Sequence, residues 1–377
     1  MIPTVVRKVS DESVSTLERL QKATFDLADG VGTTSVAIQE SIADFMRVGD
    51  SLKEAQKHAV DANTLLRVSE FDNIENATSA LISMNQAWKD IDTAHINDVL
   101  NILGNNMPIG TDELASSLQR SAGTLATLGA TLEEAAALTV AGNAILQDPE
   151  SVAAGLRTIE LRMVGTTTAK DELQAIGENV DDFVVQTESK LRESIMNLTK
   201  VASNGYKGFD ILDENGNYKS FYERMLGLSE IYEELQEQDK KLGNNSATAL
   251  IELIAGKNRS AIAGAVLSSP EVLKEAYDLA MKAEGSAQEE LNKYLESAEA
   301  KVQELKNQLQ EFWSVLLDSG TLKTIISSLT TILEKATELV DTFGTLGTAG
   351  LGLGAFLGIK NIGREKCYPS SNMPIVI

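Results

Sequence analysis

Few residues of this chain have the types and spacing that catalysis or metal binding requires. Its two histidines, His58 and His95, and its single cysteine, Cys367, cannot build a Cys-rich zinc site or an internal disulfide. The sequence has no HExxH, GxSxG or CxxC motif and no Walker lysine. We interpret both histidines as exposed or packed helix and turn residues, and Cys367 as an unpaired thiol. The sequence therefore predicts no catalytic residue, no cofactor and no metal site, in a protein that is not an enzyme.

Acidic residues outnumber basic ones and set the net charge. With 33 basic and 55 acidic residues the formal charge is −22, whereas proteins that bind duplex DNA or anionic membrane surfaces usually carry a basic excess. Adjacent acids at 133–134, 181–182 and 289–290 fit solvated helix faces or first helical turns, and no motif marks a cleft around them. The charge balance therefore predicts no sequence-specific nucleic-acid binding.

One acidic run allows two interpretations. The run Asp-Glu-Asn-Gly-Asn at 213–217 has oxygen-bearing side chains at the i, i+2, i+4 spacing of a calcium loop. Tyr218 stands where such a loop needs glycine, and Arg224 stands where it needs a bidentate glutamate. An Asn-Gly pair is also the strongest short signal for a β-turn. We therefore favour a small β-hairpin near 209–219 over a calcium loop.

The elements that surround these residues are predicted to be helices. Six prolines in 377 residues leave long uninterrupted windows, and 5% aromatic residues are few for a β-sandwich or barrel. The run from Thr131 to Glu134 has capping-box spacing, and Pro149 fits a helix start. Trp88 and Trp313 are expected to anchor cores. The predicted fold class is all-α, with a helical bundle followed by long heptad-bearing helices.

Two heptad seams provide the strongest periodic signal, and their apolar residues repeat with alternating spacings of four and three. The first seam contains Leu291, Leu295, Ala298, Val302, Leu305, Leu309, Phe312 and Leu316. The second contains Leu322, Ile326, Leu329, Leu333, Ala336, Val340 and Phe343. They are out of register across the break at 318–320, so the segment is either a helical hairpin or one long rod with a phase shift. Each seam needs a partner, from this chain or from another copy.

An uncharged segment follows at 342–359. Six of its 18 residues are glycine, and Gly350, Gly354 and Gly358 have the spacing that lets helices approach closely. As a helix it would span about 27 Å, slightly less than the hydrocarbon core of a membrane. The alternatives are a flexible Gly-rich joint, a membrane-inserting helix and, with no Walker pattern to support it, a phosphate-binding loop.

Changes in pattern along the chain divide it into five predicted segments. These are an N-terminal helical segment at 1–62, a compact helical core at 63–283, coiled-coil helices at 284–343, the Gly-rich apolar segment at 344–363 and an irregular tail at 364–377.

Several segments, taken in order, resemble the core region of phage tail tape measure proteins of long-tailed phages and prophages of Gram-positive bacteria. The resemblance extends from about residue 60 to 360. The segments that carry it are Ser117–Ala126, Gly129–Glu134, Gln147–Glu150, Leu156–Met163, Asp171–Leu173, Leu212–Lys219, Leu250–Asn258 and Phe312–Asp318.

The resemblance implies a virion structural protein that templates the length of the tail tube and assists genome ejection. It implies tail tube protein, tail assembly chaperones and baseplate proteins as partners, with self-association and contact with the host membrane. The expected location is the virion tail, and the host cytoplasm during assembly. The chain is short for this family, so we expect a truncated reading frame or one piece of a split protein. The alternatives are a membrane-active helical pore-forming protein and a wall hydrolase.

Overall fold

A computed structural model describes most of the chain, in two compact units at Met1–Tyr294 and Leu295–Ile377. The residues it describes are 4–10, 12–183, 185, 187–202, 207–318, 330–340 and 342.

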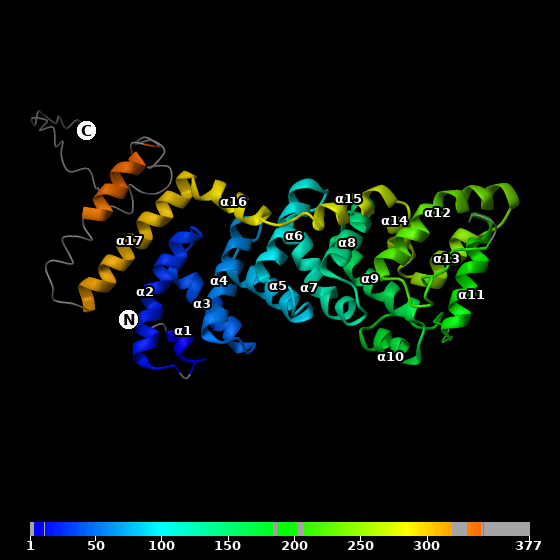
Figure 1. Ribbon diagram of the computed structural model, residues 1–377, viewed down its shortest axis with the longest axis horizontal. Coiled ribbons are helices and arrows are strands. Elements are labelled where there is room, and N and C mark those ends of the chain that lie inside the picture. The colour runs from blue at the N-terminus through cyan, green and yellow to red at the C-terminus, as the bar shows by residue number, and fades with distance from the viewer. Residues whose placement is uncertain are drawn as a thin grey trace, which may run out of the picture. The chain divides into compact units, whose positions relative to one another are not determined.

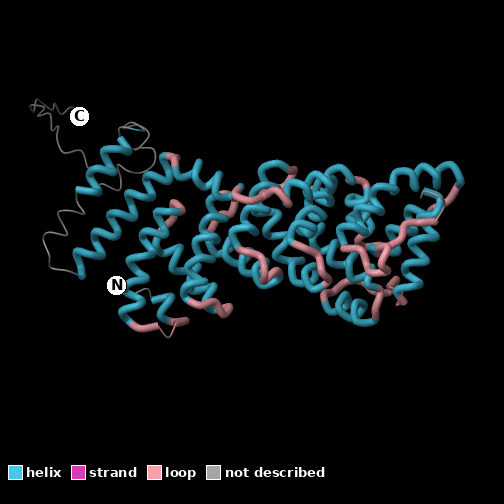
Figure 2. Tube along the Cα trace, viewed as in Figure 1, coloured by secondary structure: helices cyan, strands magenta, loops and turns pink. Residues whose placement is uncertain are grey.

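Helices provide nearly all of the regular structure in the described residues, so the predicted all-α class is confirmed (Figure 2). The helices are α1 (Thr4–Arg7), α2 (Val14–Gly30), α3 (Ser35–Arg47), α4 (Leu52–Arg67), α5 (Ile74–Ala87), α6 (Thr93–Asn106), α7 (Thr111–Thr127), α8 (Leu132–Leu146), α9 (Pro149–Val164), α10 (Thr167–Ala175), α11 (Glu188–Thr199), the 3-10 turn η1 (Lys200–Ala202), α12 (Phe221–Leu242), α13 (Ser246–Ala255), α14 (Ser260–Leu267), α15 (Pro270–Ala280), α16 (Ser286–Leu295) and α17 (Ala298–Asp318). A further helix covers 330–340.

Side-chain caps fix where many of these helices begin. The predicted capping box is present at α8, where the Thr131 hydroxyl accepts from the Glu134 N–H and the Glu134 carboxylate accepts from the Thr131 N–H, both at 3.2 Å. Asp148 caps α9 and Pro149 is its first residue, also as predicted. These contacts satisfy N–H groups that have no partner within their own helix. The short helices of the first unit therefore have defined starting points in the local sequence.

In the first unit, successive helices alternate between two rows (Figure 1). One row contains α3, α5, α7, α9 and α13, each packed on the next, and the other contains α4, α6 and α8. Neighbours in the chain, such as α3 and α4 or α7 and α8, also pack across the two rows. Short connections favour this arrangement because they bring sequential helices together as antiparallel neighbours.

The chain then reverses and returns along the second row. Helix α12 packs on α13, α14 and α15, α14 packs on α8 and α9, and α15 packs on α8 and α6. As a result, α8 packs on α7 and α9 of the first row, on α6 of its own row, and on α14 and α15 of the returning segment. Its residues are therefore buried almost all round. Its composition explains this position, because four buried alanines and Gly142 let neighbouring helices approach closely.

The loop before α12 differs from the β-hairpin that the sequence predicted near 209–219. Within the described residues its strands are reduced to one isolated bridge between Leu212 and Tyr218. The Asp213 N–H donates to the Asn217 carbonyl at 2.8 Å, and the Asp213 carboxylate accepts from the Asn217 N–H, also at 2.8 Å, so backbone and side chain together close the turn. The capping residue of α12 follows directly, so there is no room for a second strand to extend.

Candidate functional site

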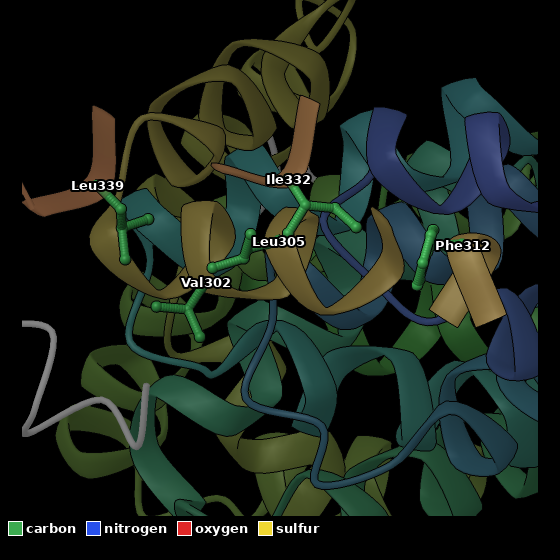
Figure 3. Packing of buried hydrophobic residues seen from close by; sticks show 5 residues of the cluster. All are labelled: Val302, Leu305, Phe312, Ile332 and Leu339. Carbon is green, nitrogen blue, oxygen red and sulfur yellow. The ribbon is translucent and has the colours of Figure 1, made fainter. Parts of the chain in front are cut away.

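The second unit contains an apolar seam between two helices. Helix α17 and the helix at 330–340 pack through a cluster of five buried residues, which Figure 3 shows: Val302, Leu305, Phe312, Ile332 and Leu339. Leu309 and Ala336 are partly buried against it. Leu339 lies beside Val302 and Ile332 lies beside Leu305, so the two helices run in opposite directions (Figure 3). Of the two arrangements that the sequence left open, these residues form a helical hairpin.

The predicted seam residues differ in where they lie. Val302, Leu305 and Phe312 are buried in the hairpin, while Leu291 is buried on α16 in the first unit and Leu295 is half-buried. Leu333 is 65% exposed and Val340 is half-buried, because the face turned toward α17 contains Ile332, Ala336 and Leu339 instead. Leu322, Ile326 and Leu329 lie outside the described residues, as does the side chain of Leu316.

Charged residues border the hairpin seam. The Glu304 carboxylate on α17 pairs with Lys335 on the opposite helix and, at 3.5 Å, with Lys301 one turn earlier on its own helix. Both pairs are partly exposed, so they contribute little to the stability of the hairpin, and only the pair with Lys335 joins its two helices.

Phe312 and Trp313 offer a matched test of this seam. Trp313 was expected to be a core anchor, but it is 57% exposed, whereas Phe312 is 6% exposed. Adjacent helical residues point about 100° apart, so only one of the two can face the partner helix. We expect Phe312→Ala to destabilise the hairpin by about 3 kcal/mol and Trp313→Ala by less than about 1 kcal/mol. Limited proteolysis within 298–340 would measure both, and equal protease resistance would contradict the packing.

The three glycines of the apolar segment, Gly350, Gly354 and Gly358, lie outside the described residues. Among the helices that the structure describes, none combines the length and the apolar character that a membrane crossing requires.

Both histidines pair with carboxylates. His58 Nδ1 lies 2.6 Å from an Asp50 carboxylate oxygen, and the ring centroid of His58 lies 5.2 Å from that of Phe45. His95 Nε2 lies 2.8 Å from a Glu133 carboxylate oxygen. Burial opposes ionisation of Glu133, but hydrogen bonds, first that of His95, outweigh it and lower the pKa of Glu133. Each histidine thus connects two elements of the first unit.

In the acid pairs at 289–290 and 181–182, the two members of each pair have different contacts. Glu290 contacts asparagines on α6, whereas Glu289 is exposed and pairs with Lys293 one turn along its own helix. Asp182 is bound by Arg162 and Asp181 is exposed. The sequence pattern alone did not distinguish the two members of either pair.

A charged cluster joins the loop after α10 to α9 and to the turn between α13 and α14. The Arg162 side chain is 5% exposed, and its Nη2 donates to the Asp182 carboxylate at 2.5 Å. The backbone N–H of Lys257 donates to the other oxygen of Asp182 at 3.1 Å, and Arg259 Nε donates to Glu178 at 3.0 Å. Burial tends to raise the pKa of Asp182, but the hydrogen bonds from Arg162 and Lys257 outweigh it and lower that pKa.

A polar cavity of about 390 Å³ opens beside this cluster. Arg162 lies between the ring of Phe183, whose centroid is 5.4 Å from its Cζ, and the backbone of Gly256. The Nε of Arg162 has no hydrogen-bond partner among the described residues. The Arg162 guanidinium thus contacts the ring of Phe183, the backbone of Gly256 and the carboxylate of Asp182. These contacts hold α9, the loop after α10 and the turn between α13 and α14 together.

A second charged pair is almost fully buried. Arg224 Nη2 on α12 donates to both carboxylate oxygens of Glu160 on α9, at 2.8 and 3.0 Å, and the two side chains are 6% and 1% exposed. Arg224 Nε also donates to the Lys219 carbonyl at 3.1 Å. Burial raises the pKa of Glu160 and the Arg224 charge opposes that shift. The two residues are 64 positions apart, and the sequence reading did not predict their pairing.

Among the residues that the structure describes, no group of three or more His, Cys, Asp or Glu side chains could hold a metal ion. The carboxylates described above are instead bound by arginines, histidines, asparagines and backbone N–H groups.

The geometry defines an all-α protein whose charged and apolar side chains mainly join helices to one another. The chain belongs to the family of phage-related minor tail proteins, whose family model matches residues 21–256. No solved structure matches the chain. The resemblance to a tail protein is thus confirmed at the level of the family, and membership supports a structural role in the virion tail.

Proposed function

We propose that the protein is a tape measure protein that templates the length of the tail tube and assists genome ejection. The observation that carries the proposal is the family match across residues 21–256, which covers most of the first helical unit. The ordered resemblance to tape measure segments, which continues to about residue 360, supports the narrower assignment. Family membership favours this role over the pore-forming alternative.

The chain's physical properties suit such a role. A helical residue adds about 1.5 Å of length, so a mostly helical chain converts residue number into distance. A net charge of −22 repels DNA and favours a neighbour of the genome that does not bind it. The resemblance also implies self-association, although Val302, Leu305 and Phe312 of the first heptad seam pack within the chain.

The proposed role is not enzymatic. It places the protein in the virion tail, and in the host cytoplasm while the tail assembles, with tail tube protein, tail assembly chaperones and baseplate proteins as its partners. During ejection the apolar segment at 342–359 would contact the host membrane. We place the phage or prophage in a Gram-positive host, on the same resemblance.

Tail length tests the proposal directly. In the phage or prophage that encodes this chain, duplicating residues 298–340 adds 43 residues, or about 65 Å if they extend as helix. Duplicating 298–318 alone adds 21 residues, or about 32 Å. We expect electron micrographs to show tails lengthened in a ratio of about two to one, with unchanged tube diameter.

Tails of unmodified length in both duplications, assembled at normal yield, would contradict the measuring role. Such tails would leave the protein as a minor structural component. Loss of assembled tails in both duplications would not decide the matter, so in-frame deletion of 298–318 provides the third arm. The measuring role requires that deletion to shorten the tail.

A further inference from the structure

Helix α16 is the last part of the first unit, and it lies against α6 far earlier in the chain. Asp98 on α6 is 187 residues from Gly285. Residues 285–294, which we call the strap, comprise Gly285 and nearly all of α16. The returning segment ends with the strap, beyond the contacts that α15 makes with α8 and α6 (Figure 1).

Polar contacts hold the start of the strap. The Asp98 carboxylate accepts hydrogen bonds from the N–H groups of Gly285 and Ala287, at 2.8 and 2.9 Å, and so caps α16 from another helix. Asn101 donates to the Glu290 carboxylate and accepts from the Ser286 hydroxyl, both at 2.5 Å. Ser286 and Glu290 are four residues apart and so lie on the same face of α16.

Two further contacts also hold the strap. Asn105 also donates to Glu290, so one carboxylate receives two asparagines of α6. At the other end of the strap, the guanidinium carbon of Arg67 lies 5.4 Å from the ring centroid of Tyr294.

Apolar contacts beneath the strap are few. In α16 the buried residues are Ala287 and Leu291, and the residues between them are exposed or half-buried. Both line a cavity of about 250 Å³, together with residues of α2, α4 and α6 such as Leu27 and Asp61. Side chains that face a cavity lose the packing contacts that stabilise a close-packed interior.

We propose that the strap is a releasable segment, which opens from α6 while the two helical rows of the first unit stay folded. Most of its attachments are hydrogen bonds, for which water can substitute when the strap opens. Segments with few buried apolar contacts are the ones that unfold locally before the rest. Opening would expose the polar face of α6 and detach residues 285–294 from it.

Hydrogen exchange of the full chain, followed by mass spectrometry, tests this inference without any phage assembly. Amides in peptides spanning 285–294 should exchange at least about tenfold faster than amides of α8 and α9. This readout concerns the isolated protein, so its outcome is independent of the tape measure proposal.

The adjacent residues Glu289 and Glu290 provide a matched pair of variants. Glu290→Ala removes the carboxylate that both asparagines contact, and it should accelerate exchange of the strap about three- to tenfold. Glu289→Ala removes only an exposed pair with Lys293 on the same helix and should change the rate less than about twofold. Rates in α8 and α9 should not change in either variant.

Three results would overturn the proposal. The first is a strap that exchanges as slowly as α8 and α9 in the unmodified protein. The second is an equal effect of Glu289→Ala and Glu290→Ala. The third is a Glu290→Ala variant that accelerates α8 and α9 as much as the strap, which would mean that the strap opens only when the whole unit unfolds. Asp98→Asn, which weakens the cap from the α6 side, should reproduce the effect of Glu290→Ala.

Discussion

Arg224→Ala should lower the free energy of unfolding of the first unit by about 3–5 kcal/mol, because it leaves the Glu160 carboxylate buried without its partner. Glu160 is 1% exposed, and both of its oxygens accept from Arg224. In the variant the carboxyl would become protonated, since desolvation already raises its pKa. Thermal and urea unfolding followed by circular dichroism would measure the loss.

Two variants make this result specific. Arg120→Ala breaks a pair with Glu150 whose side chains are 59% and 56% exposed, and it should cost less than about 1 kcal/mol. Replacing both buried partners, as in Glu160→Leu with Arg224→Met, should recover most of the loss, because no charge then remains buried. If the double variant were no more stable than Arg224→Ala, the carboxylate would not be the source of the destabilisation.

Gly256→Ala should destabilise the first unit by about 3 kcal/mol, for two separate reasons. Gly256 has φ of +68° and ψ of 175°, a conformation that is almost restricted to glycine. A Cβ there would also lie 2.6 Å from the Cζ of Arg162, so the guanidinium would have to leave its position beside Asp182. Chemical denaturation would report the change in stability.

Gly123→Ala is the matched control. Gly123 is an exposed residue of α7, and a Cβ added there meets nothing within 4 Å. The same substitution should therefore stabilise by about 0.5–1 kcal/mol, as alanine does in a helix interior. Two results would contradict the geometry around Arg162: a Gly123→Ala variant that is less stable than the unmodified protein, or a Gly256→Ala variant that is equally stable.

Local signals allowed much of the helical structure to be predicted. The Thr131 capping box and the proline at 149 depend on residues within one turn of each other, and both mark helix starts as expected. The heptad pattern likewise pointed to α17, whose seam residues Val302 and Leu305 are buried. Such features can be inferred from sequence because the interacting groups are close in the chain.

Features that depend on distant contacts could not be predicted in the same way. Nothing near Glu160 identifies Arg224 as its partner, and nothing near Glu290 identifies Asn101. The face of the helix at 330–340 was also ambiguous, because Ile332 and Leu333 are both apolar and only packing against α17 selects Ile332. The predicted hairpin is reduced to a turn with one isolated bridge between Leu212 and Tyr218, because α12 begins directly after it at Phe221.

The strap also constrains the order in which the protein can fold during synthesis. Helices α3, α4, α5 and α7 pack mainly on near neighbours in the chain, so their packing needs only short stretches to have left the ribosome. The cap on α16 joins Asp98 to Gly285 and Ala287, and it cannot form until the chain past residue 287 has emerged. On a translating ribosome, the polar face of α6 is therefore open throughout the synthesis of the intervening helices.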